Sequence, residues 1–207
     1  MSNPTPDAAD HWNRRYASED FLFGTEANAW LQANAGVWPR GARVLCVADG
    51  EGRNSVWLAG RGLHVSAFDI AEVGVAKARR LAAHHGVTVG FQVSGVDDFA
   101  WPEAAFDGIA AIFVQFADPA LRERMFSRMA ASLKPGGTLL LQGYTPRQLH
   151  YRTGGPPQVE HLYTPELLRG AFPTLEIVTL TEYEADVAEG SGHHGRSALI
   201  GLVARRP

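Results

Sequence analysis

The chain has 207 residues, of which 45% are hydrophobic and 20% are charged, and its formal net charge is -3. This length fits one α/β domain whose core needs no disulfide or structural metal, and this composition excludes disordered and fibrous proteins. The small negative charge, without a long run of Lys or Arg, argues against nucleic acid and anionic membranes as partners.

The N-terminal residues give no targeting signal. Residues 1–10 are polar, and no apolar stretch approaches the ~20 residues that a membrane-spanning helix needs. The single cysteine, Cys46, lies in an apolar stretch and cannot form an internal disulfide, which suits a reducing compartment and argues against a cysteine-ligated metal site. We therefore expect a cytoplasmic protein without a metal site. The sequence does not predict the oligomeric state.

In chain order, the first predicted elements are two short helices over residues 8–16 and 26–34, and we expect residues 1–40 to form a helical cap on a single domain spanning 1–207. Residues 43–47 then form a β-rich run without polar alternation, which is typical of a strand buried on both faces of a parallel sheet. The sequence Asp49-Gly50-Glu51-Gly52 predicts a turn, and residues 54–59 continue as a helix.

The same strand–helix unit follows twice more. Strands are predicted over residues 63–69, 87–93, 106–113 and 138–142, and helices over 71–85 and 119–133. The short basic run of Lys77, Arg79 and Arg80 predicts a solvated helix face. Residues 134–137, Lys-Pro-Gly-Gly, end a helix and allow a positive-φ turn into the next strand.

Residues 144–163 are irregular and carry aromatic and histidine side chains, which predicts a lid or binding loop. Thr164-Pro165-Glu166 predicts the start of a helix. Two further strands, over residues 175–183 and 197–204, are joined by the glycine-rich segment 189–195, which is too short for a crossover helix. The sequence therefore predicts a doubly wound, mostly parallel seven-stranded sheet whose last strand is antiparallel.

The glycine turn is the strongest functional signal. In open α/β sheets a ligand lies beyond the carboxyl ends of the strands, where glycines let a nucleotide approach the main chain. Asp69, at the end of the second strand, is placed to accept hydrogen bonds from both hydroxyls of a ribose, and we expect its side chain to be partly exposed. The segment Val96-Asp97-Asp98-Phe99 follows the third strand, where a carboxylate and backbone can hold an adenine amine. The spacing does not decide between a dinucleotide and S-adenosylmethionine.

The chain resembles the class I S-adenosylmethionine-dependent methyltransferases, particularly a small bacterial branch related to tellurite-resistance and thiopurine-type enzymes. The resemblance covers Trp12 to the C-terminus and depends on residues 50–54, 68–70, 106–107 and 133–137 and on the closing hairpin. It departs from the commoner family pattern at Cys46, Ala48 and Asp49.

The resemblance implies a Rossmann-like methyltransferase fold, S-adenosyl-L-methionine as cofactor and a small-molecule substrate. The methionine part of the cofactor would lie on residues 48–52, the ribose on Asp69, and the adenine beside Asp97, with Gln115 near the cofactor. The full set of predicted cofactor residues is Ala48, Asp49, Gly50, Glu51, Gly52, Asn54, Asp69, Ile70, Val96, Asp97 and Gln115, with Trp12 and Tyr16 from the N-terminal cap.

The predicted activity is methyl transfer to a small acceptor, such as a thiol or a metalloid oxyanion. The predicted acceptor-binding residues, all in loops expected at the carboxyl edge of the sheet, are Tyr144, Tyr151, His161, Tyr163, His193 and Arg196, and His194 is a further candidate. No residue is assigned to catalysis. Two alternatives stay open: a nicotinamide-dependent oxidoreductase and a non-catalytic adenosylmethionine-binding regulatory protein.

Overall fold

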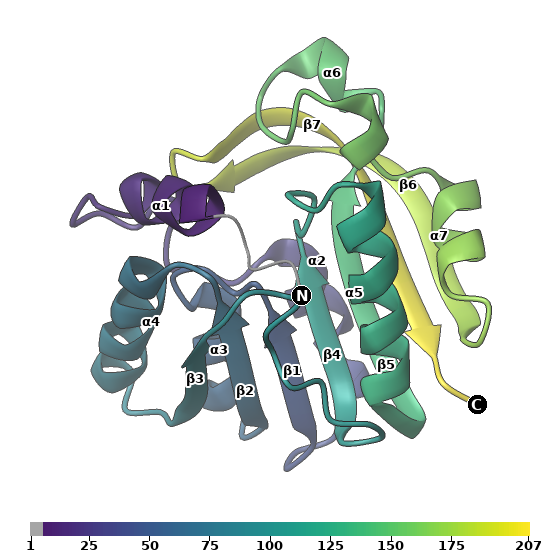
Figure 1. Cartoon of the computed structure of the whole chain (residues 1–207), viewed down its shortest axis with the longest axis horizontal. Coiled ribbons are helices and arrows are strands. Elements are labelled where there is room, and N and C mark those ends of the chain that lie inside the picture. The colour runs from purple at the N-terminus through teal and green to yellow at the C-terminus, as the bar shows by residue number, and fades with distance from the viewer. Residues whose placement is uncertain (1–5) are drawn as a thin grey trace.

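The computed structural model describes residues 6–207 and shows one seven-stranded sheet with helices on both faces (Figure 1). The strand order is β3-β2-β1-β4-β5-β7-β6. The strands are β1 (Arg43–Val47), β2 (His64–Asp69), β3 (Val89–Val93), β4 (Phe106–Ile112), β5 (Leu133–Tyr144), β6 (Glu176–Glu189) and β7 (His193–Arg205).

The strands β1 to β5 are parallel to one another, whereas β7 runs antiparallel to both β5 and β6. The predicted doubly wound sheet with an antiparallel last strand is therefore confirmed. The helices are α1 (Pro6–Arg15), α2 (Ala29–Asn34), α3 (Arg53–Gly60), α4 (Glu72–His84), α5 (Pro119–Ser132), α6 (Gln148–Tyr151) and α7 (Pro165–Ala171), with 3-10 turns η1 (Ala35–Val37) and η2 (Val159–His161).

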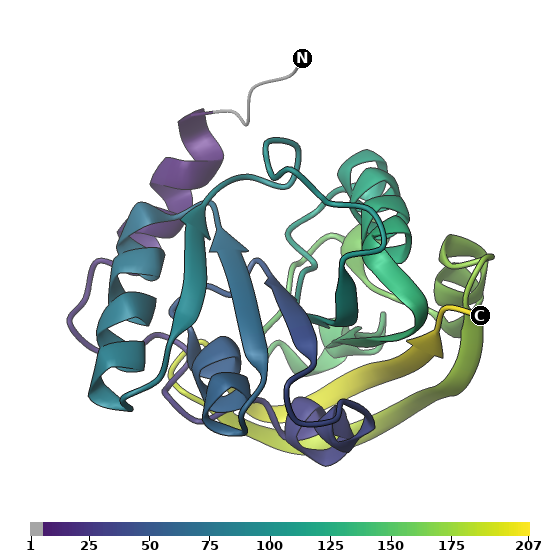
Figure 2. The same cartoon turned by 90° about the horizontal axis from the view of Figure 1, so that it is seen from below.

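Two apolar layers hold the helices against the sheet. Because side chains alternate along a strand, Leu45 and Val47 join the layer that includes the buried residues of α5 and α7, while Val44 and Cys46 join the layer of α2 and α3 on the opposite face. Figure 2 shows these helix groups on opposite sides of the sheet. Both faces of β1 are thus buried, as its uninterrupted apolar sequence predicts.

The closing hairpin is longer than the sequence indicates. Strands β6 and β7 extend to Glu189 and begin again at His193, so the predicted loop over residues 189–195 is reduced to the turn 190–192. Figure 1 shows the hairpin reaching past the carboxyl ends of the central strands toward the segment that follows α1. A Cβ atom on Gly190 would lie 2.5 Å from the amide nitrogen of Gly24. The hairpin tip therefore packs on the N-terminal segment.

Residues 144–163 contain regular structure. Tyr144 ends β5, α6 and η2 follow, and the side-chain oxygen of Gln148 accepts a hydrogen bond of 2.8 Å from the amide of Ala198. The amide of Tyr163 donates to the carbonyl of Tyr144 at 2.9 Å. These bonds fix both ends of the segment to β5 and β7, and its role as a substrate lid stays a prediction.

Candidate functional site

The turn between β1 and α3 takes a conformation that needs glycine. Gly50 has φ 59° and Gly52 has φ 89°, which side chains other than glycine rarely adopt. A Cβ atom on Gly52 would lie 2.6 Å from Cβ of Ala78 in α4, and one on Gly50 would lie 2.7 Å from the hydroxyl of Tyr16. The two glycines therefore also serve packing, because they let α4 and the N-terminal cap approach the turn.

Two non-glycine residues at the same edge of the sheet have positive φ. Ala48, directly after β1, has φ 48°, and Phe113, directly after β4, has φ 56°. Each conformation costs about 1–3 kcal/mol and is found most often at functional sites. Of the five positive-φ non-glycine residues in the described part of the chain, these two therefore lie at the carboxyl edge, where the sequence predicts the ligand.

Asp69 ends β2 and lies against the glycine turn. Its carboxylate accepts hydrogen bonds from the amide of Gly50 at 2.8 Å and from the amide of Ala71 at 2.9 Å. The residue is only 6% exposed, so the expected partial exposure is wrong. The reason is that the carboxylate supports the turn. Each of its oxygens still has a lone pair for a hydroxyl donor.

Two carboxyl groups at this edge have perturbed acidity. Burial raises the pKa of Asp49 to about 7, with a further contribution from Asp69, while hydrogen bonding from Ser55 opposes the shift. Burial also raises the pKa of Asp69 to about 6, against the hydrogen bonds from the amides of Ala71 and Gly50. A cation placed beside them would relieve the cost of their charges.

Glu51 has a buried cation as its partner. Its carboxylate forms an ion pair with Lys77 of α4, and both side chains are 2% exposed. The prediction that Lys77 lies on a solvated helix face is therefore wrong. The ammonium group also donates to the carbonyls of Ser18 at 2.9 Å and Asp20 at 2.6 Å. Lys77 points inward because the cap places backbone acceptors over α4.

The residues predicted at the adenine have partners within the protein. The carboxylate of Asp97 pairs with Arg124 and Arg128, each at 2.8 Å, and the hydrogen bond from Arg124 lowers the pKa of Asp97. The carbonyl of Val96 accepts a hydrogen bond of 2.7 Å from the indole of Trp101. Ile70, next to Asp69, is half-buried. The adenine contact stays a prediction, and the Asp97 carboxylate is held by two arginines of α5.

Gln115 does not present a free side chain to a cofactor. Its amide nitrogen donates to the carbonyls of Tyr144 at 2.9 Å and His161 at 3.0 Å, and its side-chain oxygen accepts from the amide of Tyr144 at 2.6 Å. The residue is 2% exposed. The predicted cofactor contact of this side chain is therefore replaced by a structural role in joining β5 to η2.

The N-terminal cap lies over the turn as the sequence predicts. Tyr16 is buried against Gly50, and the ring of Trp12 stacks on it with centroids 5.5 Å apart. Asn54 at the start of α3 accepts a hydrogen bond of 3.0 Å from the amide of Asn28. These contacts bring Trp12, Tyr16 and Asn54 to the turn, and whether they touch a ligand stays a prediction.

The predicted acceptor residues separate into two groups. Tyr144 and His193 are buried together at the carboxyl ends of β4 and β5, where the His193 ring contacts Phe23, Phe113 and Tyr144 with centroids 4.5, 4.4 and 5.7 Å apart. Tyr163, by contrast, is fully buried in the main apolar layer. Although its backbone lies in the loop between η2 and α7, its ring packs inward against Phe126 of α5 and presents no exposed surface to a substrate.

The remaining candidates lie nearer the surface. His161 is half-buried, with Nδ1 3.0 Å from the carbonyl oxygen of Gln115. Tyr151 ends α6, and Arg196 is an exposed residue of β7 that pairs with Glu184 at 3.1 Å. His194, the neighbour of His193, is exposed. Substrate contact by these residues stays a prediction.

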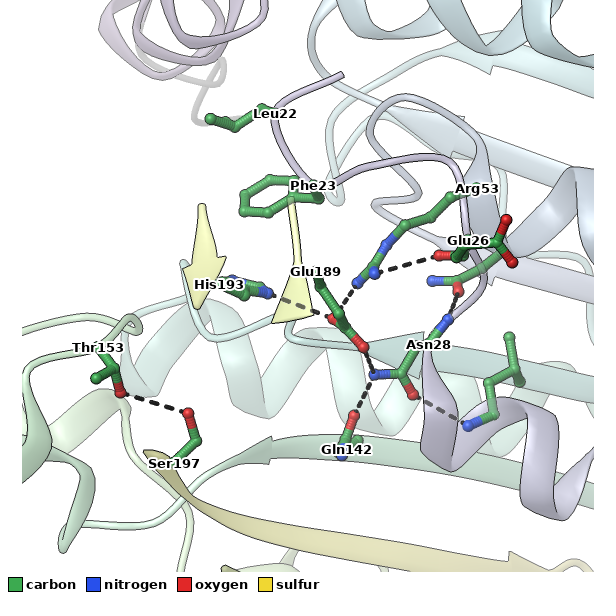
Figure 3. A network of polar contacts seen from close by, with 12 residues as sticks. Leu22, Phe23, Glu26, Asn28, Arg53, Gln142, Thr153, Glu189, His193 and Ser197 are labelled. Carbon is green, nitrogen blue, oxygen red and sulfur yellow. Dashed lines mark hydrogen bonds and ion pairs between the residues drawn. The ribbon is translucent and has the colours of Figure 1, made fainter. Parts of the chain in front are cut away.

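Sequence reasoning missed a polar network that joins the cap, α3 and the hairpin (Figure 3). Glu189 forms an ion pair of 2.6 Å with Arg53 and accepts a hydrogen bond of 2.8 Å from the side-chain amide of Asn28. That amide also donates to the side-chain oxygen of Gln142 at 2.6 Å. The only sequence signal was the presence of polar residues in segments predicted to reach the carboxyl edge. Local patterns do not show that residues 28, 53 and 189 meet.

Other features do not point to a second site. Among residues 6–207, no three His, Cys, Asp or Glu side chains are grouped to hold a metal ion. No helix in this described part is long and apolar enough to cross a membrane. A cavity of about 430 Å³ lies at the opposite, amino-terminal edge of the strands, beside Trp38, Asp107 and Gly136. Asp107, the acid in its lining, is already paired with Lys134 at 2.7 Å.

Comparison with known proteins agrees with the geometry. Residues 44–137 match the family described as Methyltransferase domain. Among curated proteins, a Ubiquinone biosynthesis O-methyltransferase of Xanthomonas axonopodis pv. citri is 37% identical over 106 residues, which cover 50% of this chain and 43% of that protein. The match thus spans less than half of that relative's length.

Solved structures share the fold over most of the chain. A SAM-dependent methyltransferase of Methanosarcina mazei superposes with a TM-score of 0.70 at 19% identity, covering 87% of this chain and 98% of that one. TehB of Haemophilus influenzae superposes with a TM-score of 0.68 at 15% identity, covering 96% of this chain and 67% of that one. The predicted Rossmann-like methyltransferase fold is confirmed.

Proposed function

We propose that this chain transfers a methyl group from S-adenosyl-L-methionine to a small-molecule acceptor. The match of residues 44–137 to a methyltransferase domain and the shared fold support the proposal. The observation that carries the proposal is the joint placement of the Gly50–Gly52 turn and the Asp69 carboxylate at the carboxyl edge. A fold alone does not determine a function, so the proposal depends on this site.

The site fits this cofactor by charge and by hydrogen bonding. S-adenosylmethionine carries a sulfonium and an ammonium group, and the buried carboxyl groups of Asp49 and Asp69 are the acidic neighbours that would favour them. The remaining lone pairs of Asp69 would accept the ribose hydroxyls. When bound, the cofactor would supply an electrophilic methyl group.

The chain's own residues would then align the acceptor and exclude water. The aromatic cluster of Phe23, Phe113 and Tyr144 encloses His193 next to the turn, which makes it the best candidate for the acceptor side. A thiol or a metalloid oxyanion is one proposed acceptor class. The curated relative named an O-methyltransferase favours an oxygen acceptor.

The two alternative functions predict different ligands. An oxidoreductase would bind NAD in place of the adenosyl sulfonium compound. A non-catalytic regulatory protein would bind the cofactor and turn over no acceptor. The match of residues 44–137 to a methyltransferase domain favours the methyltransferase proposal over the oxidoreductase, and turnover of an acceptor separates it from the regulatory protein.

Calorimetric titration tests the cofactor, with S-adenosylhomocysteine and NAD as the two probes. We expect S-adenosylhomocysteine to bind and NAD not to bind. Asp69→Asn should weaken the first interaction about 10-fold or more, since a hydrogen bond to a charged group contributes about 1.5–3 kcal/mol. Glu103→Gln, at an exposed acid before β4, is the matched control and should change the affinity less than twofold. Binding of NAD without S-adenosylhomocysteine would overturn the proposal.

A methyl-transfer screen with thiols, selenite, tellurite, phenols and small amines tests the activity. Formation of S-adenosylhomocysteine that depends on the acceptor supports transfer. Tight cofactor binding with no product from any acceptor class would favour the regulatory alternative.

A further inference from the structure

His193 is enclosed by aromatic rings from three separate segments. It is the first residue of β7 and is 9% exposed. Its ring lies against Phe23 of the N-terminal segment, Phe113 after β4 and Tyr144 at the end of β5. The backbone of Phe113 is in the strained positive-φ region. The imidazole is thus the polar group of an otherwise aromatic wall at the carboxyl edge.

The carboxylate of Glu189 lies beside this imidazole, with Oε2 3.6 Å from Nδ1 of His193. Arg53 and Asn28 hold the carboxylate from the other side, at 2.6 and 2.8 Å (Figure 3). Burial alone would raise the pKa of Glu189, but the charge of Arg53 and its hydrogen bond help to lower it to about 2. Glu189 is therefore a fixed anion directed at Nδ1.

This arrangement leaves the second ring nitrogen available. Within the described part of the chain, no hydrogen bond to Nε2 of His193 is formed. Nδ1 has no close hydrogen-bond partner either, because 3.6 Å is too long for one. Catalytic hydrogen bonds are often long in unliganded enzymes and tighten when substrate binds. A proton on Nδ1, directed at Glu189, leaves Nε2 as a free base.

We propose that His193 is the general base of the methyl transfer, that Glu189 is its positioning residue, and that the acceptor is an aromatic hydroxyl compound. The inference depends on the proposed function and narrows its acceptor class. The aromatic wall can pack against the planar ring of an acceptor. Nε2 of His193, which has no hydrogen-bond partner, can accept the proton that a hydroxyl group loses when it is methylated.

In the proposed step, Nε2 of His193 would accept the proton of the acceptor hydroxyl while a lone pair of the hydroxyl oxygen forms the bond to the methyl carbon. The carbon–sulfur bond breaks with its electron pair on sulfur, and the imidazolium, held by Glu189, later releases its proton to water. A phenol has a pKa near 10 and a thiol near 8.5, so a hydroxyl acceptor needs this base more than a thiol does.

The charged and titratable groups around His193 set its protonation. They are Glu189 of β6, Arg53 of α3, Arg15 of α1 and Tyr144 of β5. Burial lowers the pKa of His193, with contributions from Arg53 and Arg15, while Glu189 acts in the opposite direction. The ring is therefore neutral at pH 7 and able to accept a proton.

Nuclear magnetic resonance of protein labelled with ¹⁵N-histidine tests the base without any acceptor. We expect a neutral His193 ring at pH 7 with its proton on Nδ1. Glu189→Gln should shift the proton toward Nε2, because the amide no longer favours Nδ1–H. A charged ring at pH 7, or a neutral wild-type ring with its proton on Nε2, would overturn the proposal. The spectrum of His193→Asn assigns the signal.

Single-turnover methyl transfer tests the acceptor class with 4-methylcatechol and 4-methylbenzenethiol as probes. His193→Asn should slow the reaction of the catechol about 100-fold or more and that of the thiol less than threefold. His85→Asn, at an exposed histidine directly after α4, is the matched control and should leave both rates unchanged. The rate with the catechol should fall at low pH as His193 becomes protonated.

The failure of this inference is distinguishable from that of the proposed function. Methylation of the thiol but not of the catechol by the wild-type protein would overturn the hydroxyl acceptor and leave the methyltransferase proposal intact. Absence of S-adenosylhomocysteine binding would instead overturn the proposed function.

Discussion

Lys77 and Glu51 form an ion pair in the interior of the protein, with both side chains 2% exposed. The pair links α4 to the glycine turn. It also holds the N-terminal segment, because Lys77 donates to the carbonyls of Ser18 and Asp20 and Glu51 accepts from the amide of Leu22 at 2.8 Å. The buried Lys77 therefore holds the N-terminal segment against the carboxyl edge of the sheet.

Replacing this lysine should destabilise the protein strongly. Lys77→Met leaves Glu51 and the carbonyls of three residues without their cation, and we expect a loss of about 3–5 kcal/mol in the free energy of unfolding. Urea denaturation measures it. Arg80→Met, at an exposed position of the same helix, is the control and should cost less than about 0.5 kcal/mol. Equal losses in the two variants would show that the buried pair contributes nothing particular.

The turn should not tolerate a side chain at Gly52. In Gly52→Ala the new Cβ would lie 2.6 Å from Cβ of Ala78, at a φ of 89°. We expect a loss of about 3 kcal/mol or more, because backbone strain adds to the overlap. Gly60→Ala in the same helix has no atom within 4 Å of the new Cβ and should stabilise the protein by up to about 1 kcal/mol. Thermal unfolding of the two variants compares them directly.

Stability should depend on pH through Asp49. The pKa of Asp49 is about 7 in the folded protein, against an ordinary value of 3.8. Between pH 3.8 and pH 7 the folded state therefore binds more protons than the unfolded state. The contribution of Asp49 to stability is then least favourable above pH 7, by up to about 4 kcal/mol, and this penalty disappears as the pH falls below 4.

The variant Asp49→Asn isolates this effect. It should match the wild type in free energy of unfolding near pH 4 and exceed it at pH 8, because the amide stays neutral. Urea denaturation at several pH values measures the difference. A difference that does not vary with pH would contradict the raised pKa.

Gln115 should contribute to the stability of the fold and contribute little to the affinity for the cofactor. Gln115→Leu removes three hydrogen bonds to the main chain of Tyr144 and His161, and we expect a loss of about 3 kcal/mol. The affinity for S-adenosylhomocysteine, measured by calorimetry in the folded variant, should change less than threefold. Gln158→Leu, at an exposed loop position, serves as the control. A large loss of affinity with unchanged stability would restore the predicted cofactor contact.

Most of the fold could be predicted because its signals are local. The apolar run of β1, the glycine turn after it and Asp69 at the end of β2 all occur within short segments, and each has its predicted place in the structure. Thr164 caps α7 as predicted, and its side chain accepts a hydrogen bond from the amide of Leu167. The antiparallel β7 follows from a connection too short for a crossover helix.

The exposure of individual side chains was less predictable. The sequence predicts Tyr163 and His193 to be loop residues, yet both side chains are buried. Their segments have no clear periodicity, so nothing local indicates which way a ring points. Lys77 has a charge that favours solvent, and only the carbonyl groups of a segment that lies 57 to 61 residues earlier bring it inside.

By itself, the sequence determined the sheet, the turn at its carboxyl edge and the acid beside that turn, because strand burial, glycine conformation and chain connectivity are encoded in neighbouring residues. Only the tertiary structure decided that Asn28, Arg53 and Glu189 meet beside His193. These contacts span up to 161 residues, and they form because the β6–β7 hairpin reaches over the sheet edge to the N-terminal segment. That packing depends on the whole chain, and no local sequence pattern indicates it.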